Sequence, residues 1–130
     1  MQNMSGGKSA IGLDGNITAL IGYPIGILAL ILIFIEKDNK FVRFHALQSV
    51  LWSVGLTVVV IVLMIVGSIL GIAVAMASST LAYLVWGVFA LLYLVWFLAL
   101  FGGIIYGAIK AYGGQMTKLP IVGNMAEKWT

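Results

Sequence analysis

Three long runs of apolar residues, each free of charged side chains, constrain this chain more than any other feature. The first run covers residues 17–35, the second is uncharged from residue 44 and strongly apolar over 50–76, and the third covers 81–109. A helix rises about 1.5 Å per residue and a bilayer core is about 30 Å thick, so roughly 20 apolar residues cross it once. Two crossings with a turn need about 40 residues, which no run supplies. The sequence therefore predicts an all-α integral membrane protein with three transmembrane helices, at about residues 17–35, 44–76 and 81–109.

The composition excludes a water-soluble domain and several kinds of site. Hydrophobic residues make up 62% of the 130 residues and charged residues 8%, whereas soluble domains carry about 25% charged residues. The chain has no cysteine and one histidine, which excludes a disulfide, a thiolate metal site and a multi-histidine metal site. The apolar runs hold no paired carboxylates, so we expect neither an enzyme nor a cofactor. The basic residues behind the net charge of +3 are spread thinly beside the apolar runs, where they indicate membrane topology. We therefore do not expect nucleic acid as a partner.

The basic residues predict an orientation for a single membrane domain over residues 1–130. With three crossings, the N-terminus shares one side with the Ser78-Ser79 turn, and the 36–43 loop shares the other with the tail at 110–130. Lys8 alone then lies on the first side, and six basic residues lie on the second: Lys37, Lys40, Arg43, Lys110, Lys118 and Lys128. Because basic residues favour cytoplasmic segments, the N-terminus is expected outside and the C-terminus inside.

The tail carries its own pattern. Gly113-Gly114 should end the third helix, because glycine adopts the conformations that terminate helices. Pro120 suits a first helical turn, and Ile121, Met125 and Trp129 then recur every four residues. We expect a short helix at the cytoplasmic interface of the membrane. Because Gly123 weakens a helix, an irregular docked segment is the alternative.

Each run contains a pair of glycines four residues apart, a spacing that lets helices approach closely in lipid. The candidate packing residues are Gly22, Gly26, Gly67, Gly71, Gly103 and Gly107. Pro24 lies within the first pair and is expected to kink that span. These pairs favour a homo-oligomer or association with another membrane protein.

The third run also carries aromatic residues at near-helical spacing, namely Tyr83, Trp86, Tyr93 and Phe97. They predict helix packing and an interfacial belt, or alternatively a wall that lines a substrate path.

The candidate polar site is formed by Arg43, His45, Gln48 and Ser49 at the start of the second span. At about 100° per residue, the last three share one helix face, while Arg43 points about 160° away from His45. In a structural interpretation, Arg43 reaches anionic lipid head groups at the cytoplasmic face, and His45 and Gln48 form interhelical hydrogen bonds. In a functional interpretation, the cluster binds a head group or a transported polar group.

Two segments carry a family resemblance. The segment from Glu36 to Ser49, which contains Arg-Phe-His-Ala-x-Gln-Ser, and the tail segment 110–123, which contains Leu-Pro-Ile-Val-Gly, resemble a family of small uncharacterised prokaryotic multi-pass membrane proteins. That family is in turn similar to the Tic import component of the plastid inner envelope. The resemblance implies a protein of the cell membrane without an assigned catalytic role, and through the plastid relative a translocon.

Two functions remain open at this point. The first is a non-enzymatic membrane component that associates with itself or with another membrane protein. The second is an oligomeric transporter, channel or translocon-like component, whose pathway several copies would have to enclose.

Overall fold

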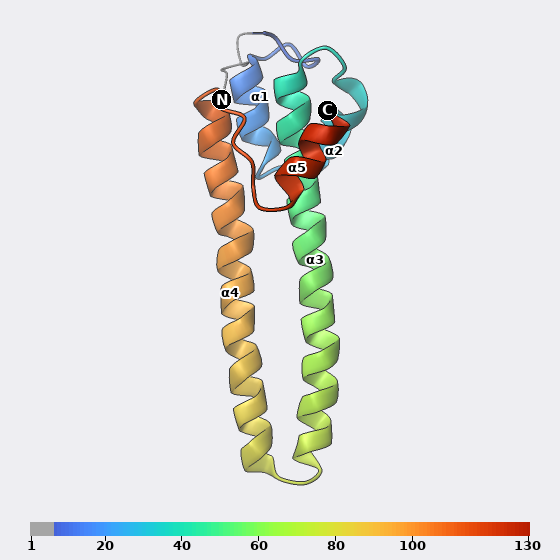
Figure 1. Cartoon of the computed structure of the whole chain (residues 1–130), viewed down its shortest axis with the longest axis vertical. Helices are drawn as coiled ribbons and strands as arrows, with labels where there is room; N and C mark the ends of the chain where they lie inside the picture. Colours follow the sequence, from blue (N-terminus) through green and yellow to red (C-terminus); the bar gives the residue numbers. More distant parts are fainter. Residues whose placement is uncertain (1–6) are drawn as a thin grey trace. The chain divides into compact units, whose positions relative to one another are not determined.

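The computed structural model describes residues 7–130, and in that part of the chain it is all-helical (Figure 1). The helices are α1 (Gly15–Gly22), α2 (Gly26–Ile35), α3 (Lys40–Ala75), α4 (Ser79–Tyr112) and α5 (Val122–Trp129). Only α3 and α4, among the described residues, are long and apolar enough to cross a membrane. The predicted all-α class is confirmed, and the second and third runs form long apolar helices as predicted.

The chain forms two compact units. Unit 1 consists of the residues up to Ser53 and from Phe101 onward, and unit 2 is Val54–Leu100. Unit 1 therefore holds α1, α2, α5, the start of α3 and the end of α4, and unit 2 holds the rest of α3 and α4 with the turn between them.

The first apolar run is not one helix, and the prediction of a continuous span over residues 17–35 was wrong. It is divided into α1 and α2, which are 8 and 10 residues long, with a break at Tyr23, Pro24 and Ile25. Proline lacks a backbone N–H and clashes with the preceding turn, which is enough to end a helix here rather than kink it. Gly22 and Gly26 consequently do not share a helix face. Instead, α1 and α2 pack against each other within unit 1.

The segments that flank this run meet at one place in unit 1. The Glu36 carboxylate, which is 2% exposed, accepts hydrogen bonds from the backbone N–H of Ala10 at 2.6 Å and of Asn39 at 3.1 Å. The Asn39 side chain donates to the carbonyl of Gly7, and Lys8 forms an ion pair with Asp14. Lys8 therefore lies beside the 36–43 loop, and its predicted separation from the other basic residues was wrong.

Local hydrogen bonds fix the ends of the long helices. Asn39 caps α3 by accepting from the N–H of Val42 at 3.3 Å, and Ser78 caps α4 by accepting from Leu81 at 3.3 Å. At the other end of α4, Gly114 has a φ of 77°. The N–H of Gln115 reaches the Lys110 carbonyl and that of Gly114 reaches Ala111, which together form a Schellman motif. The predicted glycine stop after the third run is confirmed.

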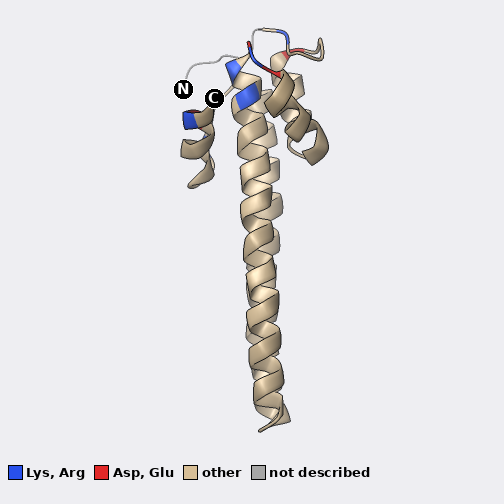
Figure 2. Cartoon of the chain, turned by 90° about the vertical axis from the view of Figure 1, so that its right-hand side faces the viewer, with Lys and Arg blue, Asp and Glu red and all other residues tan. Residues whose placement is uncertain are grey.

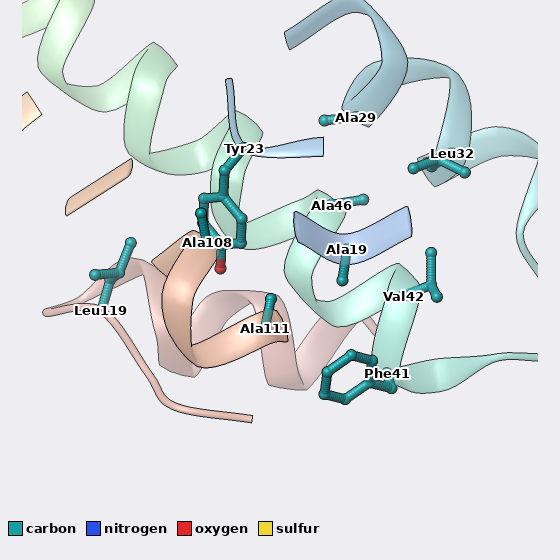
Figure 3. Packing of buried hydrophobic residues seen from close by; sticks show 10 residues of the cluster. All are labelled: Ala19, Tyr23, Ala29, Leu32, Phe41, Val42, Ala46, Ala108, Ala111 and Leu119. Atoms are coloured by element: carbon teal, nitrogen blue, oxygen red, sulfur yellow. The ribbon is translucent and has the colours of Figure 1, made fainter. Parts of the chain in front are cut away.

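Half of the residues in the larger buried core cluster of unit 1 are alanines, whose small side chains let the helices lie close together (Figure 3). Its buried members come from α1, α2, the first turns of α3, the last turns of α4 and the tail: Ala19, Tyr23, Ala29, Leu32, Phe41, Val42, Ala46, Ala108, Ala111 and Leu119. Tyr23 lies at the break between α1 and α2, and it is 2% exposed. The break that Pro24 imposes thus places a tyrosine hydroxyl inside the unit.

In unit 2, aromatic side chains of α4 fit against glycines of α3. A Cβ atom on Gly67 would lie 2.8 Å from Phe89 Cδ1, and one on Gly71 would overlap the Trp86 indole. Trp96 Nε1 donates to the Leu56 carbonyl at 2.7 Å. Of the four aromatic residues singled out in the sequence, Trp86 contacts α3 of the same chain in this way, as the packing interpretation expects, and Phe89 and Trp96 do so beside it.

Candidate functional site

The single histidine lies in a fully enclosed part of unit 1. His45 is 0% exposed, and the rings of Phe41 and Phe44 pack edge-on against it at centroid distances of 4.7 and 5.1 Å. Its Nε2 is 2.9 Å from the Gln115 carbonyl, which can only accept, so Nε2 carries the proton. In the neutral ring Nδ1 must then accept, and the Tyr23 hydroxyl donates to it at 2.7 Å.

Gln48, one turn further along α3, uses all of its amide group. Its Nε2 donates to the Tyr23 hydroxyl oxygen at 2.8 Å and to the Thr117 carbonyl at 3.0 Å. Its Oε1 accepts from the backbone N–H of Leu119 at 2.7 Å. The hydrogen bonds therefore form one chain from Gln48 through Tyr23 to His45 and on to Gln115, and each donor meets an acceptor.

These side chains have one kind of partner in common, namely backbone groups. Gln115, Thr117 and Leu119 belong to the non-helical segment between α4 and α5, and Ser49 Oγ donates to the Gly22 carbonyl at the α1 break, at 3.1 Å. Backbone polar groups outside helices are costly in an apolar setting unless a partner satisfies them. The polar face of α3 supplies those partners.

Arg43 serves the same purpose for the end of α2. Its guanidinium Nη1 donates to the carbonyls of Ile33 at 2.7 Å and Glu36 at 3.1 Å. Carbonyls at the last turn of a helix lack intrahelical partners and carry partial negative charge, so a cation there is favourable. Arg43 thus lies apart from the face that holds His45, Gln48 and Ser49, as the helical spacing predicts.

Arg43→Met is expected to lower the free energy of unfolding by about 1 to 2 kcal/mol, because two charge-assisted bonds to the end of α2 are lost. Arg43→Lys should lower the free energy of unfolding less, since a lysine ammonium keeps the positive charge although it lacks the planar array of donors of the guanidinium. Reversible unfolding in mixed detergent micelles measures both. Equal stability of Arg43→Met and the parent chain would contradict this role.

Two participants were absent from the sequence-based site. Tyr23 is the hub of the network, and a tyrosine next to a proline inside an apolar run was the available signal. Gly123 in α5 is the second, because a Cβ there would lie 2.7 Å from Lys118 Cα and 2.9 Å from Gln48 Oε1. The glycine that weakens α5 as a helix is what lets α5 approach Gln48.

Five of the six candidate packing glycines have neighbours within the chain. A Cβ on Gly103 would overlap the Trp52 indole, one on Gly107 the Tyr23 ring, and one on Gly22 would contact Leu32 at 3.8 Å. Only Gly26 of the six has open space around its Cβ position. Close approach at these glycines is thus used by side chains of the same chain, and they do not by themselves indicate a second copy.

The chemistry available to this cluster is limited. Within residues 7–130, every buried side-chain nitrogen and oxygen has a hydrogen-bond partner, and His, Cys, Asp and Glu form no group of three that could hold a metal ion. Unit 2 contains an apolar groove of about 310 Å³ between Gly67 and Ile72 on α3 and Trp86 and Tyr93 on α4. Its lining offers little to a polar substrate.

An all-helical integral membrane protein, whose buried polar groups serve its own irregular backbone, is the class that this fold and cluster define. The chain belongs to the MamF/MmsF family, described as the magnetosome magnetite crystal formation protein family, which it matches over residues 10–126.

Three similar proteins are named UPF0132 membrane proteins. The chain is 33% identical over 127 residues to a UPF0132 membrane protein of Methanocaldococcus jannaschii, covering 95% of this chain and 96% of that protein. It is 31% identical over 121 residues to a second one from the same organism, covering 92% and 73%. A UPF0132 membrane protein of Archaeoglobus fulgidus is 30% identical over 114 residues, covering 87% and 92%. No solved structure matches the chain.

The expected membership of a small uncharacterised membrane protein family is therefore confirmed. The comparisons do not show the similarity to the plastid import component, which stays an expectation.

Proposed function

We propose that this protein is a non-enzymatic membrane component in which unit 2 spans the bilayer and unit 1 lies at its cytoplasmic face. The distribution of charge carries the proposal. All eleven charged residues of the chain belong to unit 1, and Val54–Leu100 contains none (Figure 2). Charge is costly at the bilayer centre, so a segment without charge is the one suited to cross it.

The length of unit 2 suits this role. Its parts of α3 and α4, residues 54–75 and 79–100, each supply 22 residues. At about 1.5 Å per residue each part is about 33 Å long, close to the roughly 30 Å thickness of the hydrocarbon core. Two full crossings follow, joined by the turn at residues 76–78.

The first apolar run then enters the membrane and returns. With 8 and 10 residues, α1 and α2 are about 12 and 15 Å long, too short to cross. The outward face of α2 is nevertheless apolar, with Ile27 76% and Phe34 70% exposed. Because the segments that flank the run meet at Glu36, the pair is best described as a re-entrant hairpin.

This topology replaces the expectation of an external N-terminus. With two crossings, both termini lie on the same side, and the positive-inside preference makes that side cytoplasmic. The seven Lys and Arg residues, all in unit 1, then lie where anionic lipid head groups are the expected contacts. Association with a second copy or another membrane protein stays a prediction. A transport role is disfavoured, because the polar groups of His45 and Gln48 are engaged within unit 1.

Single-cysteine labelling tests the topology directly, since the chain has no cysteine of its own. We expect Lys8→Cys, Asp38→Cys and Lys128→Cys to react with an impermeant maleimide only from the cytoplasmic side. Ser79→Cys should react only from the opposite side. Lys8 is the decisive position, because a three-span protein would place it with Ser79. Labelling of both from the same side would overturn the two-span proposal.

A further inference from the structure

The short helix α5 presents three distinct sectors around its axis. Gly123 and Ala126 face the core of unit 1, and both are buried. At about 100° per residue, a polar sector of Asn124, Glu127 and Lys128 follows around the helix, and then a third sector. That third sector consists of Ile121, just before the helix, with Met125 and Trp129, which are 79%, 37% and 50% exposed. We call these three residues the outer stripe.

Ile121 is the most unusual member of the outer stripe. Its φ is 66°, and it is the one described residue other than glycine with a positive φ. This region is unfavourable for a β-branched side chain, and a largely exposed isoleucine gains nothing from water that would offset the strain. The strained backbone turns this apolar side chain outward at the point where α5 begins.

The polar sector is held in place from the other side. Lys118 donates to the Asn124 side chain at 3.2 Å and forms an ion pair with Glu127. These bonds, together with the burial of Gly123 against Gln48, fix the rotation of α5 about its axis. The outer stripe therefore cannot turn inward without breaking them.

We propose that the outer stripe inserts into the bilayer interface and that its occupant is lipid. The proposal rests on the proposed function, which places unit 1 at the membrane. An apolar sector beside a charged one is the arrangement of a helix lying in the interface, with tryptophan at head-group depth. Unit 1 also exposes apolar side chains on α2, where Ile27 and Phe34 project, so α5 is not the only helix of this unit that offers an apolar face to lipid.

Spin labels on single cysteines measure the depth of each position. The labelled variants are Ile121→Cys, Met125→Cys and Trp129→Cys for the outer stripe, and Asn124→Cys and Lys128→Cys for the polar sector. The protein is reconstituted in vesicles of phosphatidylcholine and phosphatidylglycerol. We expect a ratio of oxygen to nickel-chelate accessibility several-fold higher along the outer stripe than in the polar sector.

Two results would overturn the proposal. Equal and high nickel accessibility at all five positions would show that the stripe faces water. Spin–spin broadening between labelled copies, confined to the stripe, would show that protein covers it. Ile121→Asn, which tolerates the positive φ, should leave the label at Lys128 water-exposed while lowering the oxygen accessibility at Met125. The sidedness of Ser79 is measured separately, so failure here is distinguishable from failure of the topology.

Discussion

Gln48→Leu is expected to release the C-terminal segment from α3 and to lower the free energy of unfolding by about 2 to 6 kcal/mol. Leucine has a similar volume but leaves the partly buried Thr117 carbonyl and the buried Leu119 N–H without partners. Each unsatisfied buried group costs about 1 to 3 kcal/mol. Native proteins are stable by only about 5 to 15 kcal/mol, so this is a large fraction of the total.

Limited trypsin digestion at Lys110 and Lys118 measures the release, and detergent unfolding measures the stability. Gln115→Leu is the matched control, because its side chain is exposed and only its carbonyl serves His45. The stability of Gln48→Glu should lie between those of the parent chain and Gln48→Leu, since a carboxylate still accepts from the Leu119 N–H but cannot donate to the Thr117 carbonyl. A Gln48→Leu protein that folds and resists trypsin like the parent, yet loses a cellular phenotype, would favour a binding site instead.

Gly103→Leu is expected to destabilise the protein by about 3 kcal/mol or more, while the same change at the adjacent Gly102 should not destabilise it. A Cβ on Gly103 would overlap the Trp52 indole, whereas the Cβ position of Gly102 has no atom within 4 Å. Overfilling a packed contact costs about 1 to 3 kcal/mol for smaller insertions. At Gly102 the gain in helix propensity, about 1 kcal/mol, is the main effect.

Both variants are compared by unfolding in the same mixed micelles. Combining Gly103→Leu with Trp52→Ala should recover part of the loss, because the truncated side chain vacates the space that leucine needs. Additive losses in the double variant would mean that Gly103 and Trp52 do not form the contact.

Some candidate residues could be predicted because helical spacing is a local property. Once 40–75 is a helix, His45, Gln48 and Ser49 must share a face, and Arg43 must lie elsewhere. What these side chains bind was not predictable. Their partners lie 22 to 71 residues away in the sequence: the hydroxyl of Tyr23 and backbone groups of Gly22, Gln115, Thr117 and Leu119.

The first apolar run shows where the length argument failed. Its 19 residues suffice for one crossing, and the hydrophobicity of a run does not distinguish a spanning helix from two short ones. Pro24 was expected to bend the helix, which neighbouring groups often permit. The helix ends at Pro24 instead, where Ser49 satisfies the Gly22 carbonyl at the break and the Glu36 carboxylate joins the segments that flank the run.

The sequence by itself determined that the apolar runs suit lipid rather than water and that two of them form long helices. Both follow from the local density of apolar and charged side chains. It also determined where α4 stops, because Gly114 suits the positive φ that a Schellman motif requires. Only the tertiary structure decided that the first run folds back and that Lys8 joins the other charged residues in unit 1. The physical reason is that these outcomes depend on hydrogen bonds between distant segments, whose free energy no local pattern records.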